Sequence, residues 1–235
     1  SRNTALGYNA MTDTTSGQNN TAVGTTALGN NTTATGNTAV GKSALADNTT
    51  GEENVAVGEN SLANNTTAGG NTAVGRGSMF TNTTGANNVG IGFDALYANT
   101  TGASNTALGK NALAANTTGY EQTAAGYRAL ATNTTGFRNT TFGADSLLLN
   151  TTGYDNSAFG KSALQDNTTG ETNTGLGNYA LANNTTADDN TAVGYQALTT
   201  NTTGTVNTAV GKNALLVNTT GGYNVAIGHE SMLAN

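Results

Sequence analysis

The sequence predicts an all-β fold, a parallel β-solenoid (β-roll) of about fourteen 17-residue coils. A glycine follows a short run of small and apolar residues fourteen times, always seventeen residues after the previous one. The chain has no Pro and no Cys, only 9% charged residues and a net charge of −6. Stacked coils must stay in phase, whereas a disordered polar tract tolerates changes of length. The unbroken period therefore favours a stacked solenoid over disorder.

Each repeat opens with a predicted strand. With position 1 placed at Asn3, the consensus reads N-T-A-V-G-x-x-A-L-x-x-N-T-T-G-x-x. Positions 2 and 4 of an extended segment share one face, and position 3 points to the other. Position 3 carries almost only Ala, whereas position 4 is apolar in every copy. We expect positions 2 and 4 to face the coil interior and position 3 to face a closely packed neighbour.

Position 5 is glycine in all fourteen copies and ends this strand. A positive φ or a close backbone approach excludes a Cβ at such a point. We therefore assign a structural turn role to a set of fourteen glycines: Gly7, Gly24, Gly41, Gly58, Gly75, Gly92, Gly109, Gly126, Gly143, Gly160, Gly177, Gly194, Gly211 and Gly228.

The rest of the repeat predicts a second short strand and a turn. Positions 8 and 9 read Ala-Leu in most copies, and we expect the Leu to point inward. Asn-Thr-Thr-Gly at positions 12 to 15 is typical of turns. A helical repeat is the alternative, but β-branched Thr and the regular glycines oppose it.

The small number of large apolar residues predicts association with other chains. One coil offers one Leu, one Val and two Ala as its apolar side chains. Their burial is small beside the conformational entropy lost by seventeen ordered residues. We expect a homo-oligomer, a trimer or a filament, in which neighbouring chains cover further surface.

Three copies carry a recognisable motif at positions 1 to 5: Asn54–Gly58, Asn88–Gly92 and Asn224–Gly228. The motif resembles the N-S-V-A-I-G pattern of YadA-like heads in trimeric autotransporter adhesins, and similar repeats occur in phage-type tail fibres. The resemblance extends over the whole chain and implies a left-handed parallel β-roll wound as a trimer. The coil of the family is usually shorter than seventeen residues, and Thr here replaces the first Val in most copies.

The Asn-Thr-Thr turn matches the N-glycosylation sequon in one register. It predicts either a column of glycans or a ladder of stacked asparagine amides that complete the turn, and stacked glycans would crowd. We favour the ladder. Twelve asparagines form this set: Asn31, Asn48, Asn65, Asn82, Asn99, Asn116, Asn133, Asn150, Asn167, Asn184, Asn201 and Asn218.

Recognition is expected at the variable positions 6, 7, 10, 11, 16 and 17, which carry nearly all charges. Tyr120, Phe137 and Tyr154 occupy position 16 in three consecutive copies. We expect them to stack in a file, either as a platform for a sugar or receptor or simply as a stabilising stack.

The chain shows no pattern that predicts an enzyme, a cofactor or a metal site. The single histidine, His229, has no evident partners for a catalytic triad. Gly36–Ser43 matches the phosphate-binding loop formally, but the match lies across a predicted strand. The acidic balance argues against nucleic acid, and no apolar stretch is long enough to cross a membrane.

We therefore expect residues 1–235 to form a single repeat domain, a segment of a longer extracellular fibre at a cell surface or on a virion tail. The fibre would present repetitive surfaces for attachment to a host surface, a matrix or a glycan, or for filament formation. The first alternative is a structural filament with a glycan at each Asn-Thr-Thr turn, and the second is an ice-binding solenoid.

Overall fold

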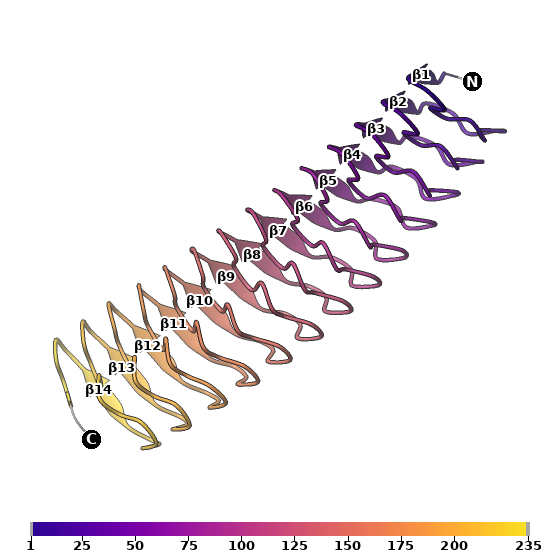
Figure 1. The fold of residues 1–235 in the computed structure, drawn as a ribbon. Helices are drawn as coiled ribbons and strands as arrows, with labels where there is room; N and C mark the ends of the chain where they lie inside the picture. The colour runs from indigo at the N-terminus through magenta and orange to yellow at the C-terminus, as the bar shows by residue number, and fades with distance from the viewer. Residues whose placement is uncertain (1, 234–235) are drawn as a thin grey trace. The chain divides into compact units, whose positions relative to one another are not determined.

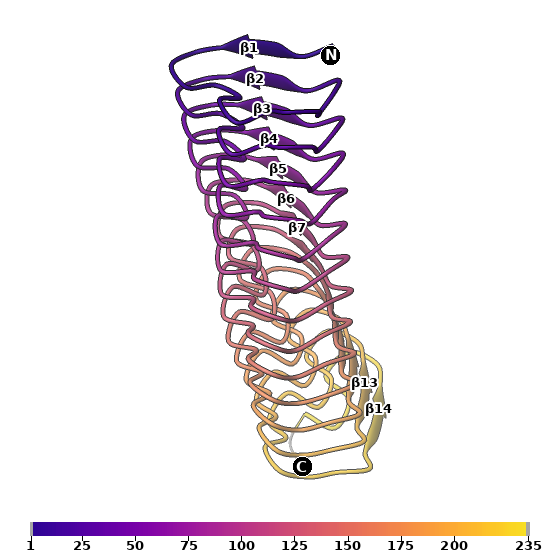
Figure 2. The same cartoon turned by 90° about the vertical axis from the view of Figure 1, so that its right-hand side faces the viewer.

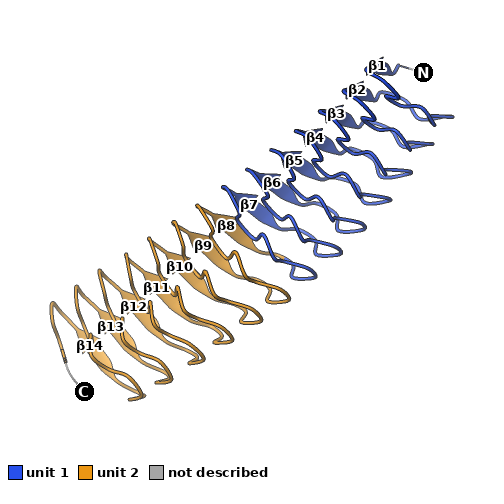
Figure 3. Ribbon diagram, in the orientation of Figure 1, with its two compact units in different colours: residues 1–120 blue, residues 121–235 orange. Residues whose placement is uncertain are grey.

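A computed structural model describes residues 2–233, which contain fourteen short strands and no helix (Figure 1). The chain divides into two compact units, residues 1–120 and 121–235 (Figure 3). The strands of the first unit are β1 (Thr4–Leu6), β2 (Thr21–Val23), β3 (Thr38–Val40), β4 (Val55–Val57), β5 (Thr72–Val74), β6 (Val89–Ile91) and β7 (Thr106–Leu108). Those of the second unit are β8 (Thr123–Ala125), β9 (Thr140–Phe142), β10 (Ser157–Phe159), β11 (Thr174–Leu176), β12 (Thr191–Val193), β13 (Thr208–Val210) and β14 (Val225–Ile227).

Within each unit the strands pair in parallel and in chain order. Every paired residue lies seventeen positions from its partner, as in Ala22↔Ala39 of the first unit and Ala192↔Ala209 of the second. The stack β1–β7 can be followed in Figure 2, where each strand lies directly below the one before it. The predicted parallel β-solenoid is confirmed.

Backbone hydrogen bonds between coils continue far beyond the three-residue strands. The amide of Leu45 donates to Ser61 O at 3.0 Å, Asp47 N to Ala63 O at 2.9 Å, and Thr49 N to Thr66 O at 2.9 Å. Each 17-residue segment thus closes one turn of backbone that bonds to the coils above and below.

The second strand predicted at positions 8 and 9 is wrong, because positions 6 to 11 form consecutive turns. Positions 7 and 9 both have positive φ, as at Asp145 (58°) and Leu147 (50°). A left-handed conformation costs a residue with a Cβ roughly 1–2 kcal/mol. Full burial of a Leu side chain contributes roughly 1.5–3 kcal/mol, so packing outweighs local preference.

The predicted orientation of the strand is also wrong. Position 3 points into the coil and is fully buried in most copies, whereas positions 2 and 4 point outward. The interior is narrow: a Cβ added to Gly175 at position 3 would lie 3.6 Å from Cδ1 of Leu164 across the coil. Only small side chains fit opposite the position 9 residues, so the alanines mark the interior and not a packed neighbour.

The core of each unit is a single file of position 9 side chains between small residues. Its largest fully buried members are Leu28, Leu45, Leu62, Met79, Leu96, Leu113, Leu130, Leu147, Leu164, Leu181, Leu198 and Leu215.

The position 5 glycines adopt a conformation that their surroundings require. Gly177 has φ of +136°, and an added Cβ would lie 2.5 Å from the carbonyl oxygen of Gly194 in the next coil. Both reasons given for glycine at this point, the positive φ and the close backbone approach, hold here.

Candidate functional site

The position 12 asparagines form a buried ladder along each unit. Asn99 is fully buried, and its Nδ2 donates to Asn82 Oδ1 at 2.7 Å and to Gly102 O at 2.9 Å. The first bond joins neighbouring coils, and the second closes the Asn-Thr-Thr-Gly turn. The same pair of bonds recurs at Asn167, with Asn150 Oδ1 and Gly170 O both at 3.0 Å.

A second asparagine ladder runs along position 1. Asn54 donates its backbone N–H to Asn37 Oδ1 at 2.9 Å and its Nδ2 to Ala68 O at 2.9 Å. Asn65 of position 12 donates to the same Ala68 carbonyl at 2.9 Å. One carbonyl at position 15 therefore joins both ladders, which satisfies polar groups that would be costly to bury unpaired.

These contacts favour the ladder over glycan attachment at the Asn-Thr-Thr turn. A glycan would have to replace a hydrogen on an Nδ2 that already donates twice inside the coil. The fully buried position 12 asparagines, from Asn31 to Asn218, also leave no path from Nδ2 to solvent.

The outward side chains of positions 2 and 4 form a surface that we term the strand face. Large apolar groups stay uncovered along it: Leu108 is 39% exposed, Phe142 43% and Leu176 47%. Phe142 also stacks on Phe159 of the next coil, with ring centroids 5.3 Å apart. Thr occupies most of position 2 and is half-buried. The strand face was not predicted from the sequence. Small residues at position 3 and larger apolar residues at position 4 do indicate that the two positions have different surroundings.

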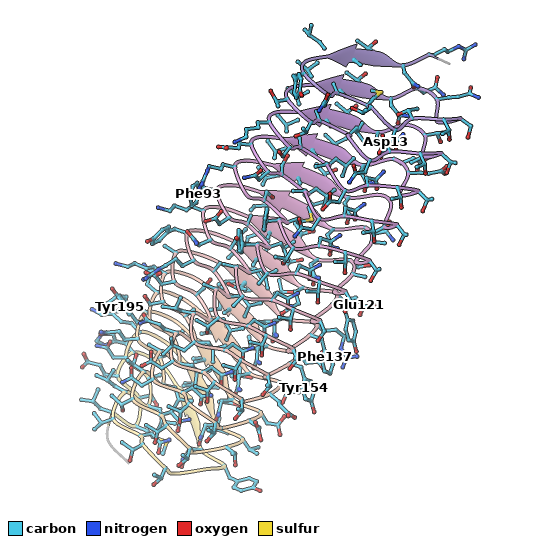
Figure 4. The ribbon with its side chains drawn as sticks, turned by 45° about the vertical axis from the view of Figure 1, so that its right-hand side comes forward. Asp13, Phe93, Glu121, Phe137, Tyr154 and Tyr195 are labelled. Carbon is cyan, nitrogen blue, oxygen red and sulfur yellow. The ribbon has the colours of Figure 1, made fainter. Side chains whose placement is uncertain are left out.

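Two of the three candidate recognition residues at position 16 stack on each other. Phe137 and Tyr154, which are labelled in Figure 4, stack with nearly parallel planes and ring centroids 4.7 Å apart. Arg138 Cζ lies 4.7 Å from the centroid of the Phe137 ring. A sugar would need a free ring face, so the contacts of Phe137 with Tyr154 and Arg138 favour the stabilising interpretation for this ring. Tyr120 is the last residue of the first unit and is 41% exposed.

Charges beside this stack are paired. Arg138 holds both carboxylate oxygens of Asp155 at 2.7 Å, and this hydrogen bonding lowers the pKa of Asp155. A hydrogen bond to Glu171 raises the pKa of Tyr154. These pairs join neighbouring coils and stabilise the stack.

Hollows open on the surface between neighbouring coils, and one of about 350 Å³ is lined by Asn9, Asp13 and Asp47. Another, of about 200 Å³, lies beside Gly77 and is lined by Arg76, Asp94 and Tyr97. In residues 2–233 no three His, Cys, Asp or Glu side chains gather where they could hold a metal ion. The side chain of His229 is largely exposed, and its Nε2 lies 3.6 Å from Oε1 of Glu230.

Across the described residues, no helix is long and apolar enough to span a membrane. A comparison of the sequence with protein-family models gives no match, and a comparison with curated protein sequences gives none either.

Proposed function

We propose that this chain is a structural and adhesive fibre segment that associates with further copies of itself through the strand face. One observation carries the proposal: the apolar position 4 side chains of each unit form a file whose members are all half-buried or exposed. Contiguous apolar patches of this kind mark interaction surfaces on soluble proteins.

The thin interior gives a second reason for association. Among the apolar side chains, only Ala and, in most coils, one Leu or Met are fully buried, so a single chain stabilises each coil with little apolar surface. Covering positions 2 and 4 would contribute a further large side chain per coil, worth roughly 1.5–3 kcal/mol if fully buried. A trimer, as the family resemblance implies, would cover this surface, and so would a side-by-side filament.

The attachment role rests on the variable positions. Positions 6, 7, 16 and 17 carry most of the charges and many of the aromatic side chains, and many of them are exposed. We place the protein outside the cell, on a cell surface or virion tail, where it would contact a host surface, a matrix or a glycan. We propose no catalytic role, because most buried polar side chains are asparagines that form hydrogen bonds in ladders between coils.

Light scattering coupled to gel filtration tests the association. The wild-type chain should show a multiple of the 23.4 kDa protomer mass, with three the expected number. Phe142→Lys with Leu176→Lys should give monomers with an unchanged circular dichroism spectrum, because both side chains point outward. Val217→Lys, at exposed position 11 outside the strand face, is the matched control and should stay oligomeric. A wild-type monomer at all concentrations would exclude the proposal.

Ice binding is a second candidate, favoured by the outward direction of the position 2 threonines. A regular file of Thr beside apolar side chains on a parallel sheet suits an ordered water lattice. A monomeric chain that produces thermal hysteresis, abolished by Thr174→Lys and Thr191→Lys, would support this candidate over the fibre.

A further inference from the structure

One surface hollow of the first unit lies at a break in a file of polar side chains. Side chains at position 7 can bond from one coil to the next, as Arg128 Nε does to Asp145 Oδ1 at 2.8 Å. Gly77 interrupts this file between Asn60 and Asp94, which are two coils apart, about 9.6 Å along the stack. Within residues 2–233, neither Asn60 nor Asp94 makes a side-chain hydrogen bond. The break therefore leaves two polar side chains with bonding capacity for a ligand.

The hollow of about 200 Å³ at this break has one polar and one apolar side. Asn60, Arg76 and Asp94 line it, and so do the rings of Phe80 and Tyr97. A Cβ added to Gly77 would lie 3.6 Å from Cδ2 of Tyr97 and would collide with Oδ1 of Asp94, so both groups border the space beside this glycine. Phe80 stacks on Tyr97, with ring centroids 5.3 Å apart and planes 13° from parallel. The two rings form a rigid apolar wall.

Arg76 brings a cationic group to the rim of the hollow. Its Cζ lies 5.4 Å from the centroid of the Phe93 ring, and its Nε lies 3.6 Å from Oε2 of Glu59. The second distance is too long for a hydrogen bond, and the side chain is 59% exposed. A guanidinium carries five N–H groups, so Arg76 has donors left for a ligand in the hollow.

The donors and acceptors around the hollow indicate the kind of ligand. Arg76 only donates hydrogen bonds, the Asp94 carboxylate only accepts them, and the Asn60 amide does both. A ligand with a net charge would meet one group of its own sign. A neutral sugar would not, since each of its hydroxyl groups both donates and accepts, and the C–H groups of its ring suit an aromatic wall.

We propose that the hollow beside Gly77 binds one neutral sugar ring of a glycan. The sugar hydroxyls would donate to Asp94 and accept from Arg76, and the ring would lie against Tyr97. The volume is below the roughly 300–1,000 Å³ of sites for drug-sized ligands, so the hollow suits a single ring. This inference rests on the proposed attachment role, but not on association through the strand face, because positions 6, 7 and 10 lie outside that face.

Gly77→Asn fills the hollow and keeps the fold. Gly77 has φ of +66°, close to the 57° of Asn60 and the 58° of Asn111, which occupy the same position in other coils. Asparagine tolerates this left-handed conformation. The carboxylate of Asp94 has to turn aside for the new side chain, and the two can then bond as position 7 neighbours. Circular dichroism should show an unchanged β spectrum for this variant.

Saturation-transfer NMR with the methyl glycosides of glucose, galactose, mannose and N-acetylglucosamine measures the binding. The wild-type chain should bind at least one of them with a dissociation constant on the order of 1–10 mM, since one ring offers few atoms. Gly77→Asn should abolish this binding, and Asp94→Asn should weaken it about tenfold through loss of a charged acceptor. Asp47→Asn, in the hollow of about 350 Å³, is the matched control and should bind like wild type. Glucuronate and glucosamine should bind at least about threefold more weakly than the neutral sugars.

A wild-type chain that binds none of these glycosides, or a Gly77→Asn variant that binds as well as wild type, would overturn the sugar site. Tighter binding of glucuronate or glucosamine would overturn the assignment to a neutral sugar. Light scattering separates the site from the proposed association, and Gly77→Asn should keep the mass of the wild type. An oligomer that binds no glycoside would overturn the sugar site alone, whereas a monomer that binds one would overturn the self-association and keep the site.

Discussion

At the residue scale, two buried side chains in each coil stabilise the fold in different ways, one by apolar packing and one by hydrogen bonding. The position 9 Leu fills the interior while its backbone adopts a positive φ, and the position 12 Asn bonds along the stack and across its own turn. Neither role is visible in propensities, because Leu seldom adopts positive φ and Asn is seldom fully buried. The repetition of each residue at one register identifies both as structural.

The coil that contains Leu147, Leu148 and Leu149 offers a matched test of the interior. Leu147 is fully buried, whereas Leu149, two residues on, is 40% exposed. Leu147→Ala should lower the free energy of unfolding by about 2–5 kcal/mol, since it leaves a cavity. Leu149→Ala should change it by less than about 0.5 kcal/mol. Urea unfolding followed by circular dichroism measures both, and equal effects would contradict the assigned core.

The asparagine ladder can be tested in the same unit. Asn167→Ala removes two donated bonds and leaves Asn184 Nδ2 without the Oδ1 that accepts from it at 2.9 Å. Unsatisfied buried groups cost about 1–3 kcal/mol, so the unfolding free energy should fall by that amount. Thr169→Ala, at an exposed position of the same turn, should be nearly neutral. A neutral Asn167→Ala would show that the ladder contributes little.

At the element scale, the period predicted the solenoid because only stacked coils forbid insertions, and the invariant glycine predicted the end of each strand. The direction of the strand could not be predicted. Alternation shows that positions 2 and 4 share a face, but an interior narrow enough for Ala alone reverses the usual rule that larger apolar residues lie inside. Positions 8 and 9 were assigned to a strand because nothing in the choice of Leu at position 9 indicates its positive φ.

Neighbouring coils also interact through charge, and pH should reveal it. Hydrogen bonds from Arg138 lower the pKa of Asp155 in the folded state, so this carboxylate stabilises the fold above its unfolded pKa. The stabilisation should be lost as pH falls through the lower, folded pKa. Asp155→Asn should therefore be less stable than wild type at pH 7, and the difference in unfolding free energy should shrink as the pH falls below 3.8, the ordinary pKa of the carboxyl group.

Urea midpoints at several pH values measure this gap, with Arg138→Gln as the control. Without the guanidinium of Arg138, Asp155→Asn should change the unfolding free energy only slightly at every pH. A gap that stays constant from neutral to acidic pH would assign the effect to packing and not to the ion pair.

At the scale of the whole molecule, we expect the chain to tolerate changes of length only in whole coils of seventeen residues. Each coil contacts its neighbours alone, so stability is close to a sum over coils and their interfaces. Removing residues 173–189 joins position 17 of one copy to position 1 of another and keeps every file in register. At about 0.05–0.15 kcal/mol per residue, this deletion should lower the unfolding free energy by about 1–3 kcal/mol.

Removing a single residue should cost more than removing a whole coil. Deleting Thr186 alone takes away an exposed side chain, but it shortens the path between Asn184 and Ala187, whose Nδ2–O bond of 2.9 Å closes the turn. The coil must then either break this bond or shift every following residue out of phase with its partner. We expect a lower melting temperature for the one-residue deletion than for the seventeen-residue deletion, measured by circular dichroism. The opposite order would mean that the turn absorbs length changes, and the exact period would then need an origin other than the stacking of coils.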